Sequence, residues 1–175
     1  ISFFEVALNS EHGLKQIAIL RDRFGEKCMI GAGTAISVDL AKAAIGAGAQ
    51  FLLTPGTPID VLQYCAKKDI MLLPGVFTPG DVATSLEFGY KTMKLFPAGC
   101  APKGYLKALK GPYDEANYIA IGGVTIDNIN DYFKEGYMGV GLASNLMPLS
   151  VLKDKNWDLG VSYVQKYVSR VKRRV

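Results

Sequence analysis

The sequence is poor in the residues that build metal centres and disulfide frameworks. Its 175 residues include one histidine, His12, and three widely spaced cysteines, Cys28, Cys65 and Cys100. A zinc-dependent enzyme needs a cluster of histidine or cysteine ligands, and an odd number of dispersed cysteines suits free thiols in a reducing compartment. The sequence therefore predicts a cytoplasmic protein with no metal and no other cofactor. His12 is interpreted as a surface residue of a helix.

Long hydrophobic runs are also absent. Glycine, proline or charge interrupts every apolar run well before the ~20 residues that a membrane-spanning helix needs, and the first residues show no basic leader. The net charge of +4 is modest and gathers late in the chain, in Lys166, Arg170, Lys172, Arg173 and Arg174. We interpret these cations as a solvated helix end that complements the helix dipole. Neither a nucleic acid nor a membrane is expected as a partner.

Short apolar segments alternate with helical segments along the whole chain. The expected strands are residues 2–8, 28–32, 51–54, 71–74, 92–96, 118–121 and 138–141. The expected helices are residues 11–24, 37–46, 58–67, 80–88, 104–109, 126–134 and 159–171. Apolar strands joined by helices indicate a parallel sheet that helices cover. Because no linker divides the chain, we expect one α/β domain over residues 1–175.

Seven strands with helices between them fall one unit short of a (β/α)8 barrel. The chain begins with Ile1 and enters its first strand within a few residues, so we expect that a leading β/α unit is missing from it. An open doubly wound sheet is the alternative, but Gly31-Ala32-Gly33-Thr34 lacks the third glycine of a dinucleotide fingerprint. The predicted fold is a (β/α)8 TIM barrel that is incomplete at its N-terminus.

Two ionisable residues lie inside apolar strands. Lys94 stands within Met93-Lys94-Leu95-Phe96, and Glu5 within Phe4-Glu5-Val6. Burial disfavours the charged form of an amine, which lowers its pKa and makes it nucleophilic near neutral pH. Taken singly, each residue has a structural interpretation, as a snorkelling lysine or as half of an ion pair. Facing one cavity, the amine and the carboxylate can divide nucleophilic attack from proton transfer.

Glycine turns follow the last two expected strands. Gly122-Gly123-Val124-Thr125 ends one strand and is expected to open a helix, and Gly141-Leu142-Ala143-Ser144 does the same after the next strand. The N–H groups of a helix N-terminus bind anions, and phosphate sites in these barrels usually follow strands seven and eight. The two turns therefore predict a phosphate site.

These features leave three functions open. A class I aldolase would use Lys94 as a Schiff-base nucleophile. A phosphosugar isomerase or epimerase would need only Glu5 as its base, together with the glycine turns. A non-catalytic phosphosugar-binding barrel would need the turns alone. The sequence has no Ser-His-Asp arrangement and no Walker loop.

Five motifs resemble, in order and spacing, those of one enzyme family. They are Phe4-Glu5-Val6-Ala7-Leu8, Ile30-Gly31-Ala32-Gly33-Thr34, Leu53-Thr54-Pro55-Gly56, Met93-Lys94-Leu95-Phe96-Pro97-Ala98 and Ile121-Gly122-Gly123-Val124. The family comprises the 2-keto-3-deoxy-6-phosphogluconate, 4-hydroxy-2-oxoglutarate and 2-keto-3-deoxy-6-phosphogalactonate aldolases, and the resemblance covers essentially the whole chain. It implies a homotrimeric (β/α)8 lyase that cleaves a phosphorylated 2-keto acid to pyruvate and glyceraldehyde 3-phosphate, as in the Entner–Doudoroff pathway.

The resemblance also implies roles for individual residues. Lys94 resembles the Schiff-base lysine, and Glu5 resembles the residue that transfers protons. Thr34 resembles a contact to the pyruvate end of the substrate, and Pro97 the residue that shapes the pocket beside the lysine. Three further residues resemble phosphate ligands, namely Gly122, Gly123 and Ser144.

Positions that differ between the sugar branches of the family point both ways. The gluconate branch has an arginine four residues after the glutamate and a threonine before the glycine pair, where this chain has Asn9 and Ile121. Both residues resemble the galactonate branch, and Asn9 is predicted to bind substrate. Thr54-Pro55-Gly56 and Phe96-Pro97-Ala98 resemble the gluconate branch instead. The stereochemistry at C4 of the substrate is left open.

Overall fold

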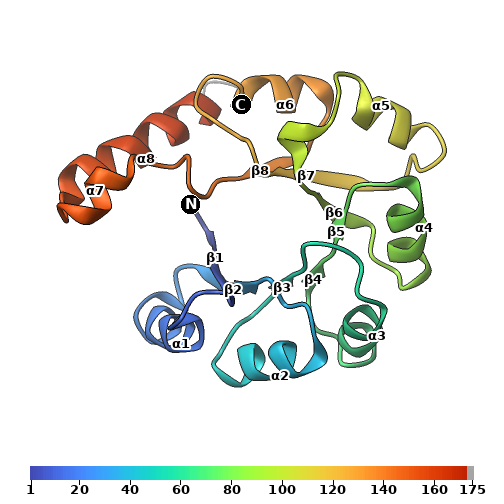
Figure 1. Cartoon of the computed structure of the whole chain (residues 1–175), viewed down its shortest axis with the longest axis horizontal. Helices are drawn as coiled ribbons and strands as arrows, with labels where there is room; N and C mark the ends of the chain where they lie inside the picture. The colour runs from blue at the N-terminus through green and yellow to red at the C-terminus, as the bar shows by residue number, and fades with distance from the viewer. Residues whose placement is uncertain (173–175) are drawn as a thin grey trace. The chain divides into compact units, whose positions relative to one another are not determined.

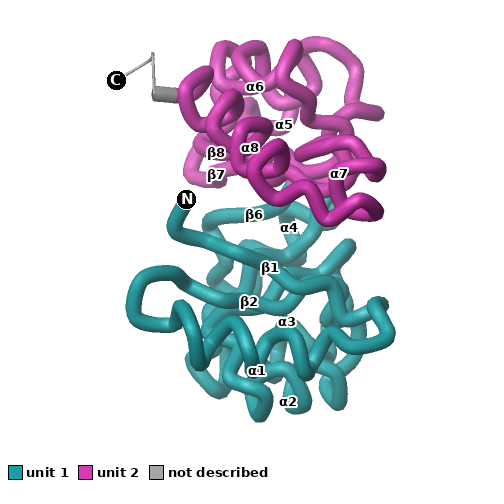
Figure 2. Tube along the Cα trace, turned by 90° about the vertical axis from the view of Figure 1, so that its left-hand side faces the viewer, with its two compact units in different colours: residues 1–94 teal, residues 95–175 magenta. Residues whose placement is uncertain are grey.

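The structure is a computed structural model in which residues 1–172 are described (Figure 1). Arg173 and Arg174, from the basic end of the chain, lie outside the described residues. The chain divides into two compact units, one of residues 1–94 and one that begins at Leu95 (Figure 2). Each unit contains strands and helices of its own. The single domain expected over residues 1–175 stays a prediction.

In the first unit, strands and helices alternate along the chain. The elements are β1 (Phe3–Ala7), α1 (Gly13–Phe24), β2 (Met29–Gly33), α2 (Val38–Gly46), β3 (Leu52–Leu53), α3 (Ile59–Lys67), β4 (Leu72–Leu73), β5 (Gly75–Val76), α4 (Pro79–Glu87) and β6 (Thr92–Leu95), whose last residue begins the second unit. Strands β1 to β4 form a parallel sheet in that order. In this register Glu5 pairs with Gly31 and Ala7 pairs with Gly33, so the carboxyl ends of β1 and β2 lie side by side.

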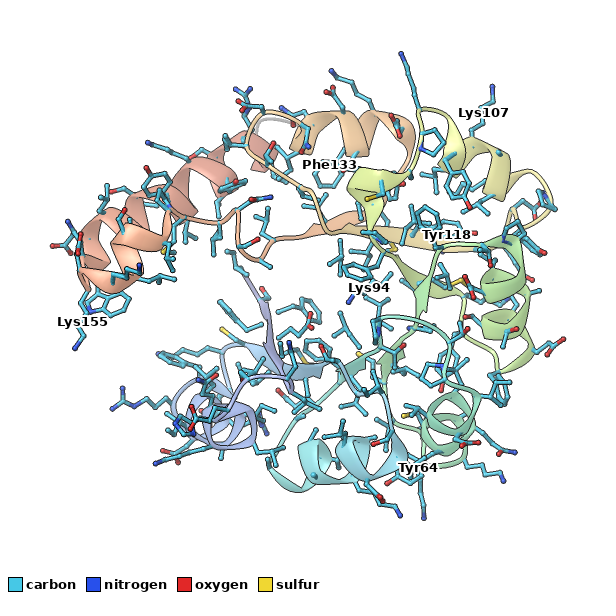
Figure 3. The ribbon with its side chains drawn as sticks, viewed as in Figure 1. Tyr64, Lys94, Lys107, Tyr118, Phe133 and Lys155 are labelled. Carbon is cyan, nitrogen blue, oxygen red and sulfur yellow. The ribbon has the colours of Figure 1, made fainter. Side chains whose placement is uncertain are left out.

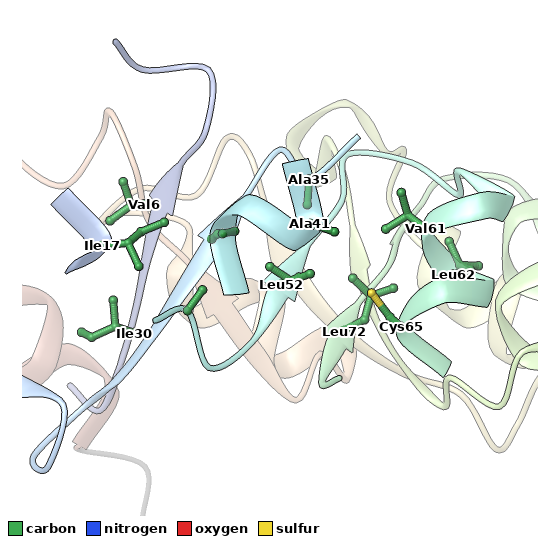
Figure 4. Packing of buried hydrophobic residues seen from close by; sticks show 13 residues of the cluster. Val6, Ile17, Ile30, Ala35, Ala41, Leu52, Val61, Leu62, Cys65 and Leu72 are labelled. Carbon is green, nitrogen blue, oxygen red and sulfur yellow. The ribbon is translucent and has the colours of Figure 1, made fainter. Parts of the chain in front are cut away.

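A hydrophobic core holds these strands against their helices. Its buried members come from both the strands and the helices (Figure 4), and include Ile17, Ile30, Leu52, Val61, Leu62, Cys65 and Leu72. Truncating a core side chain of this kind to alanine typically costs about 2–5 kcal/mol. The core therefore fixes the strand ends at which the candidate site is built.

Local capping adds to this order. Ser37 caps α2 by accepting a hydrogen bond from the Leu40 N–H. Thr78 and Asp81 form a reciprocal capping box at the start of α4, where Pro79 occupies the first helical turn. A cap of this kind is worth about 1 kcal/mol. It fixes where α4 begins, on the segment that leads from β5 to β6.

The second unit continues the alternation. Its elements are η1 (Ala98–Cys100), α5 (Tyr105–Lys110), β7 (Asn117–Ile121), α6 (Ile129–Glu135), β8 (Gly139–Gly141), α7 (Leu149–Lys153) and α8 (Trp157–Lys172). Strands β7 and β8 pair in parallel, with Ile121 opposite Gly141. Tyr118, Leu106 and Ile129 are buried in this unit. The carboxyl ends of β7 and β8 thus lie together.

The expected alternation of strands and helices is confirmed, with three elements that were not expected. These are η1, α7 and β5. Strand β5 is separated from β4 by Pro74, which has no N–H to donate to a sheet. Helix α7 has five residues, too few to show a helical repeat of apolar residues in the sequence.

The prediction that both glycine turns open helices is wrong. Helix α6 begins at Ile129, because the Asn128 Oδ1 accepts a hydrogen bond from the Thr125 N–H at 2.7 Å and holds this segment in a turn. No helix follows directly after Ser144 either, since α7 begins at Leu149. An anion at these turns would therefore contact the N–H groups of turns and not the end of a helix.

The remaining expectations concern cysteines, the histidine and membrane spans. Cys28, Cys65 and Cys100 are free, as predicted. His12 is exposed and occupies the N-cap position of α1. Within residues 1–172, no helix combines the length and the apolar character that crossing a membrane requires.

Candidate active site

Lys94 is a buried lysine in the middle of a strand. It lies on β6 between the buried Met93 and Leu95, and it is only 6% exposed (Figure 3). Its backbone N–H donates to the Pro74 carbonyl at 2.8 Å. Burial lowers the pKa of Lys94 from its usual 10.5, although the negative charge of Glu5 acts in the opposite direction. The shift favours the neutral amine that a nucleophile requires.

Glu5 is the electrostatic partner of Lys94. The residue as a whole is exposed, but its carboxylate leans along β1 toward Gly33. Surrounding atoms desolvate this carboxylate and raise its pKa from 4.5, while the charge of Lys94 lowers it. The structure therefore brings these two predicted residues together in the first unit. A carboxyl group with a raised pKa can both accept and release a proton near neutral pH.

Gly33 provides the space that the Glu5 carboxylate occupies. A Cβ atom at position 33 would overlap the Oε1 of Glu5. The overlapping atom is the end of a flexible side chain, so a methyl group here would displace the carboxylate without requiring the backbone of β2 to move. The absence of a side chain at this position thus leaves room for the carboxylate that is predicted to transfer protons.

If Glu5 transfers protons as the resemblance implies, the Gly33→Ala substitution should lower kcat for the expected aldol cleavage roughly 10- to 100-fold, the effect of misplacing a catalytic group by about 1 Å. Adduct formation between Lys94 and pyruvate should persist, because the lysine is untouched. Steady-state kinetics and borohydride trapping measure the two effects. Gly46→Ala is the matched control, since a Cβ there would meet nothing within 4 Å. Unchanged kcat in Gly33→Ala would show that Glu5 is not held by this contact.

The lowered pKa of Lys94 makes the stability of the protein depend on pH. Between the folded-state pKa and 10.5, the unfolded chain binds more protons than the folded chain, so the free energy of unfolding rises with pH. We expect Lys94→Met to unfold at a higher temperature than the wild type at neutral pH, and the gap to narrow as the pH approaches 10.5. Thermal unfolding followed by circular dichroism at several pH values tests this. A gap that widens with pH would contradict it.

Thr34, the predicted contact to the pyruvate end, has a strained backbone. It follows β2 directly and has a φ of 61°, a conformation that a β-branched residue rarely adopts. Such strain costs about 1–3 kcal/mol and is found preferentially at functional sites. The Thr34 carbonyl accepts a hydrogen bond from the Ile36 N–H at 2.9 Å, which tightens the turn. The strain supports a functional interpretation of this residue.

Asn9 lies in the turn after β1. The residue is exposed, and the adjacent Leu8 N–H donates to the Gly33 carbonyl at 2.9 Å. The Ser10 hydroxyl closes the turn by donating to the Ala7 carbonyl. The turn is therefore tied to the end of β2, one residue from Thr34.

Thr54 has a structural role that the sequence analysis did not assign. It is fully buried, and its hydroxyl donates to the Gly56 carbonyl at 2.6 Å and accepts from the Gly75 N–H at 3.1 Å. Gly75 follows Pro74, whose carbonyl binds the Lys94 N–H. Thr54 thus connects the end of β3 to the segment that holds the lysine strand. The only signal in the sequence is a hydroxyl at the end of an apolar strand.

The predicted phosphate ligands belong to the second unit. Gly122 and Gly123 have φ angles of 87° and 84°, in the left-handed region that favours glycine. A Cβ on Gly123 would lie 2.8 Å from the Gly99 Cα, and one on Gly122 would lie 3.3 Å from the Pro97 Cα. The turn is therefore packed against the segment that follows β6, which includes Pro97.

Ser144 lies close to this glycine turn. It is exposed in the loop after β8, and it lines a cavity of about 420 Å³ together with Thr125. The next residue, Asn145, donates from its Nδ2 to the Val124 carbonyl at 3.2 Å. The loops after β7 and β8 are thus joined, as the predicted phosphate site requires.

Comparison with known proteins agrees with the motifs and the geometry. The family model described as KDPG and KHG aldolase matches residues 1–162. The chain belongs to this family. The KDPG and KHG aldolase family consists of carbon–carbon lyases, so the expectation of an aldolase is confirmed. The residue-level roles stay predictions.

Individual relatives support this assignment. This family member is 31% identical over 165 residues to the 2-dehydro-3-deoxy-6-phosphogalactonate aldolase of Escherichia coli. The match covers 93% of this chain and 80% of the relative. It is 32% identical over 159 residues to the 2-dehydro-3-deoxy-phosphogluconate aldolase of Pseudomonas aeruginosa. That match covers 90% of this chain and 71% of the relative. The two identities are too close to separate the sugar branches.

A solved structure confirms the fold. The KDPG aldolase of Legionella pneumophila, with pyruvate captured as a covalent carbinolamine intermediate, matches with a TM-score of 0.87 and 30% identity. The match covers 94% of this chain and 80% of that one. The fold of this aldolase is therefore the TIM-barrel type predicted from its sequence, and the doubly wound alternative is excluded.

Proposed function

We propose that this aldolase cleaves 2-keto-3-deoxy-6-phosphogluconate or its galactonate counterpart to pyruvate and glyceraldehyde 3-phosphate through a Schiff base on Lys94. One observation carries the proposal: a buried amine with a lowered pKa on β6 interacts with the carboxylate of Glu5. Membership of the family supports the reaction class. The carbinolamine in the Legionella relative supports covalent chemistry.

In the proposed mechanism, the neutral Nζ of Lys94 attacks the C2 keto carbon, and the carbinolamine takes up a proton from solvent and loses water to give a protonated imine. Glu5 removes the proton of the C4 hydroxyl, the C3–C4 bond breaks, and its electron pair moves into the imine to form an enamine. The phosphorylated aldehyde leaves. A proton returns to C3, and hydrolysis releases pyruvate and restores the amine. Covalent catalysis replaces one difficult carbanion-forming step by easier ones.

The remaining predicted residues bind the substrate. We propose that Thr34 contacts the pyruvate end, that Pro97 shapes the pocket beside the lysine and that Asn9 binds the substrate near β1. The phosphate is held by the turns after β7 and β8, through Gly122, Gly123 and Ser144. Fixing the phosphate at one end holds the scissile bond in place, which lowers the entropic cost of reaching the transition state.

Borohydride reduction in the presence of pyruvate tests this function. A stable adduct that peptide mapping places on Lys94 is the expected result, and incubation without pyruvate is the control. A folded protein that gives no adduct would overturn the Schiff-base mechanism.

The preferred substrate follows from kcat/KM values. Cleavage of the gluconate-derived and galactonate-derived substrates should be compared with cleavage of unphosphorylated 4-hydroxy-2-oxoglutarate. Binding of the phosphate by these turns predicts a clear preference for one of the phosphorylated substrates.

The homotrimer and the cytoplasmic location implied by the resemblance stay predictions. Light scattering measures the oligomeric state.

A further inference from the structure

A chain of hydrogen bonds joins α8 to the glycine turn of the second unit. The Tyr167 hydroxyl, on α8, donates to the backbone carbonyl of Asn145 at 2.7 Å. The Asn145 Nδ2 in turn donates to the carbonyl of Val124 at 3.2 Å, the residue directly after Gly122-Gly123. Tyr167 is buried, at 6% exposed, although tyrosines are often only partly buried. This hydroxyl therefore hydrogen-bonds to the loop after β8 and not to a residue of its own helix.

Three successive carbonyls of the turn are each held by a donor from elsewhere in the unit. The carbonyl of Gly122 accepts from the Gly99 N–H at 2.8 Å, and that of Gly123 accepts from the Asn128 Nδ2 at 2.9 Å. Asn145 holds the third, on Val124. Because a peptide unit is planar, fixing a carbonyl also fixes the direction of the N–H that follows it. The fixed carbonyls of Gly122 and Gly123 thus set the directions of the Gly123 and Val124 N–H groups, whereas the Thr125 N–H, which follows the Val124 carbonyl, already donates to the Asn128 Oδ1.

Of these three donor residues, only Asn145 is adjacent in the chain to Ser144, the predicted phosphate ligand of the neighbouring loop. It follows Ser144 in the chain, and its carbonyl is fixed by Tyr167 while its side chain is fixed to Val124. The backbone carbonyl and the side-chain amide of Asn145 are therefore both hydrogen-bonded. The position of Ser144 relative to the glycine turn depends on these two hydrogen bonds. Helix α8 also forms part of the wall of the 420 Å³ cavity that Ser144 lines.

We propose that Asn145 and Tyr167 are positioning residues for the phosphate end of the substrate. Tyr167 orients Asn145, and Asn145 sets the separation between the Ser144 hydroxyl and the N–H groups of the glycine turn. The last helix of the chain thereby acts on substrate affinity, although it supplies no group to the chemistry. This inference rests on the proposed function, which assigns the phosphate to these two turns.

Tyr167→Phe and Asn145→Ala test the inference. Each variant should raise KM for the phosphorylated substrate, by roughly 3- to 10-fold for the loss of one neutral hydrogen bond, with kcat changed less than KM. The rate at which borohydride traps pyruvate on Lys94 should not change, because pyruvate carries no phosphate. Asn145 is exposed, so its alanine variant is expected to fold even if removal of the Tyr167 hydroxyl disturbs α8.

Tyr90→Phe is the matched control. The Tyr90 hydroxyl also donates to a backbone carbonyl, that of Leu62 at 2.9 Å, but it lies in the first unit. Its removal should lower the melting temperature about as much as Tyr167→Phe, with KM unchanged. Equal changes of KM in the two phenylalanine variants, or pyruvate trapping that slows in parallel with the rise of KM, would overturn the positioning role. Absence of trapping in the wild type would instead refute the proposed function.

Discussion

Lys94→Met is expected to abolish aldol cleavage, with kcat/KM falling on the order of 10⁴-fold or more. Methionine has nearly the volume of lysine and suits the buried setting between Met93 and Leu95, so the fold should survive. Without the amine there is no imine to accept the electron pair of the C3–C4 bond. Residual cleavage, measured by coupling pyruvate release to a dehydrogenase, should approach the uncatalysed rate, and borohydride should trap nothing at position 94.

Lys91→Met provides the control for this variant. Lys91 is exposed near the start of the same strand, and its replacement should leave kcat/KM within about twofold of the wild type, as for most surface substitutions. If Lys94→Met kept substantial activity, or if the pyruvyl adduct mapped to another lysine, the Schiff-base assignment would be wrong. Circular dichroism of both variants separates loss of chemistry from loss of fold.

Glu5→Gln is expected to lower kcat by about 10²- to 10⁴-fold, the usual contribution of a general acid–base group. Glutamine retains the shape of the side chain beside Gly33 but cannot carry a proton between C4, C3 and solvent. Imine formation with pyruvate should survive, since Lys94 remains buried. Exchange of the pyruvate methyl protons for deuterium, followed by NMR, reports proton transfer at C3 alone and should slow by a similar factor.

The critical part of the experiment is that borohydride trapping and deuterium exchange are measured separately. Glu11→Gln, in the exposed turn before α1, should alter neither trapping nor exchange. If Glu5→Gln lost borohydride trapping as completely as proton exchange, Glu5 would act on the amine and not on substrate protons. Full deuterium exchange in Glu5→Gln would assign proton transfer to another group.

Much of the first unit could be predicted from local patterns in the sequence. The strands that carry Glu5 and Lys94, and the strand that Thr34 follows, are short apolar runs bounded by glycine or charge, and each can be recognised from its own segment of sequence. A charged residue in such a run is conspicuous because burying it unpaired is costly. The candidate nucleophile Lys94 and its carboxylate partner Glu5 could therefore be predicted from the sequence alone.

The parts that could not be predicted depend on single side-chain hydrogen bonds, some of them local and some between segments far apart in the sequence. The late start of α6 results from the Asn128 side chain, which stabilises a turn in place of a first helical turn. The bond from Tyr167 to Asn145 spans 22 residues, and that from Gly75 to Thr54 spans 21. Asparagine and threonine compete for backbone partners in ways that residue type alone does not specify. The helix N-terminus expected at the Gly122-Gly123 turn is absent for this reason.

The space beside Gly33 that the Glu5 carboxylate occupies has a consequence for how the enzyme can change. Position 33 and the carboxylate of Glu5 share one volume, so a methyl group at position 33 either displaces the carboxylate or must be combined with a shorter acid at position 5. Gly33→Ala combined with Glu5→Asp relieves the overlap but withdraws the carboxylate from the lysine. A mutational scan would therefore score position 33 as sensitive although it carries no side chain, with a smaller loss of activity than at position 5, because the displaced carboxylate is still present.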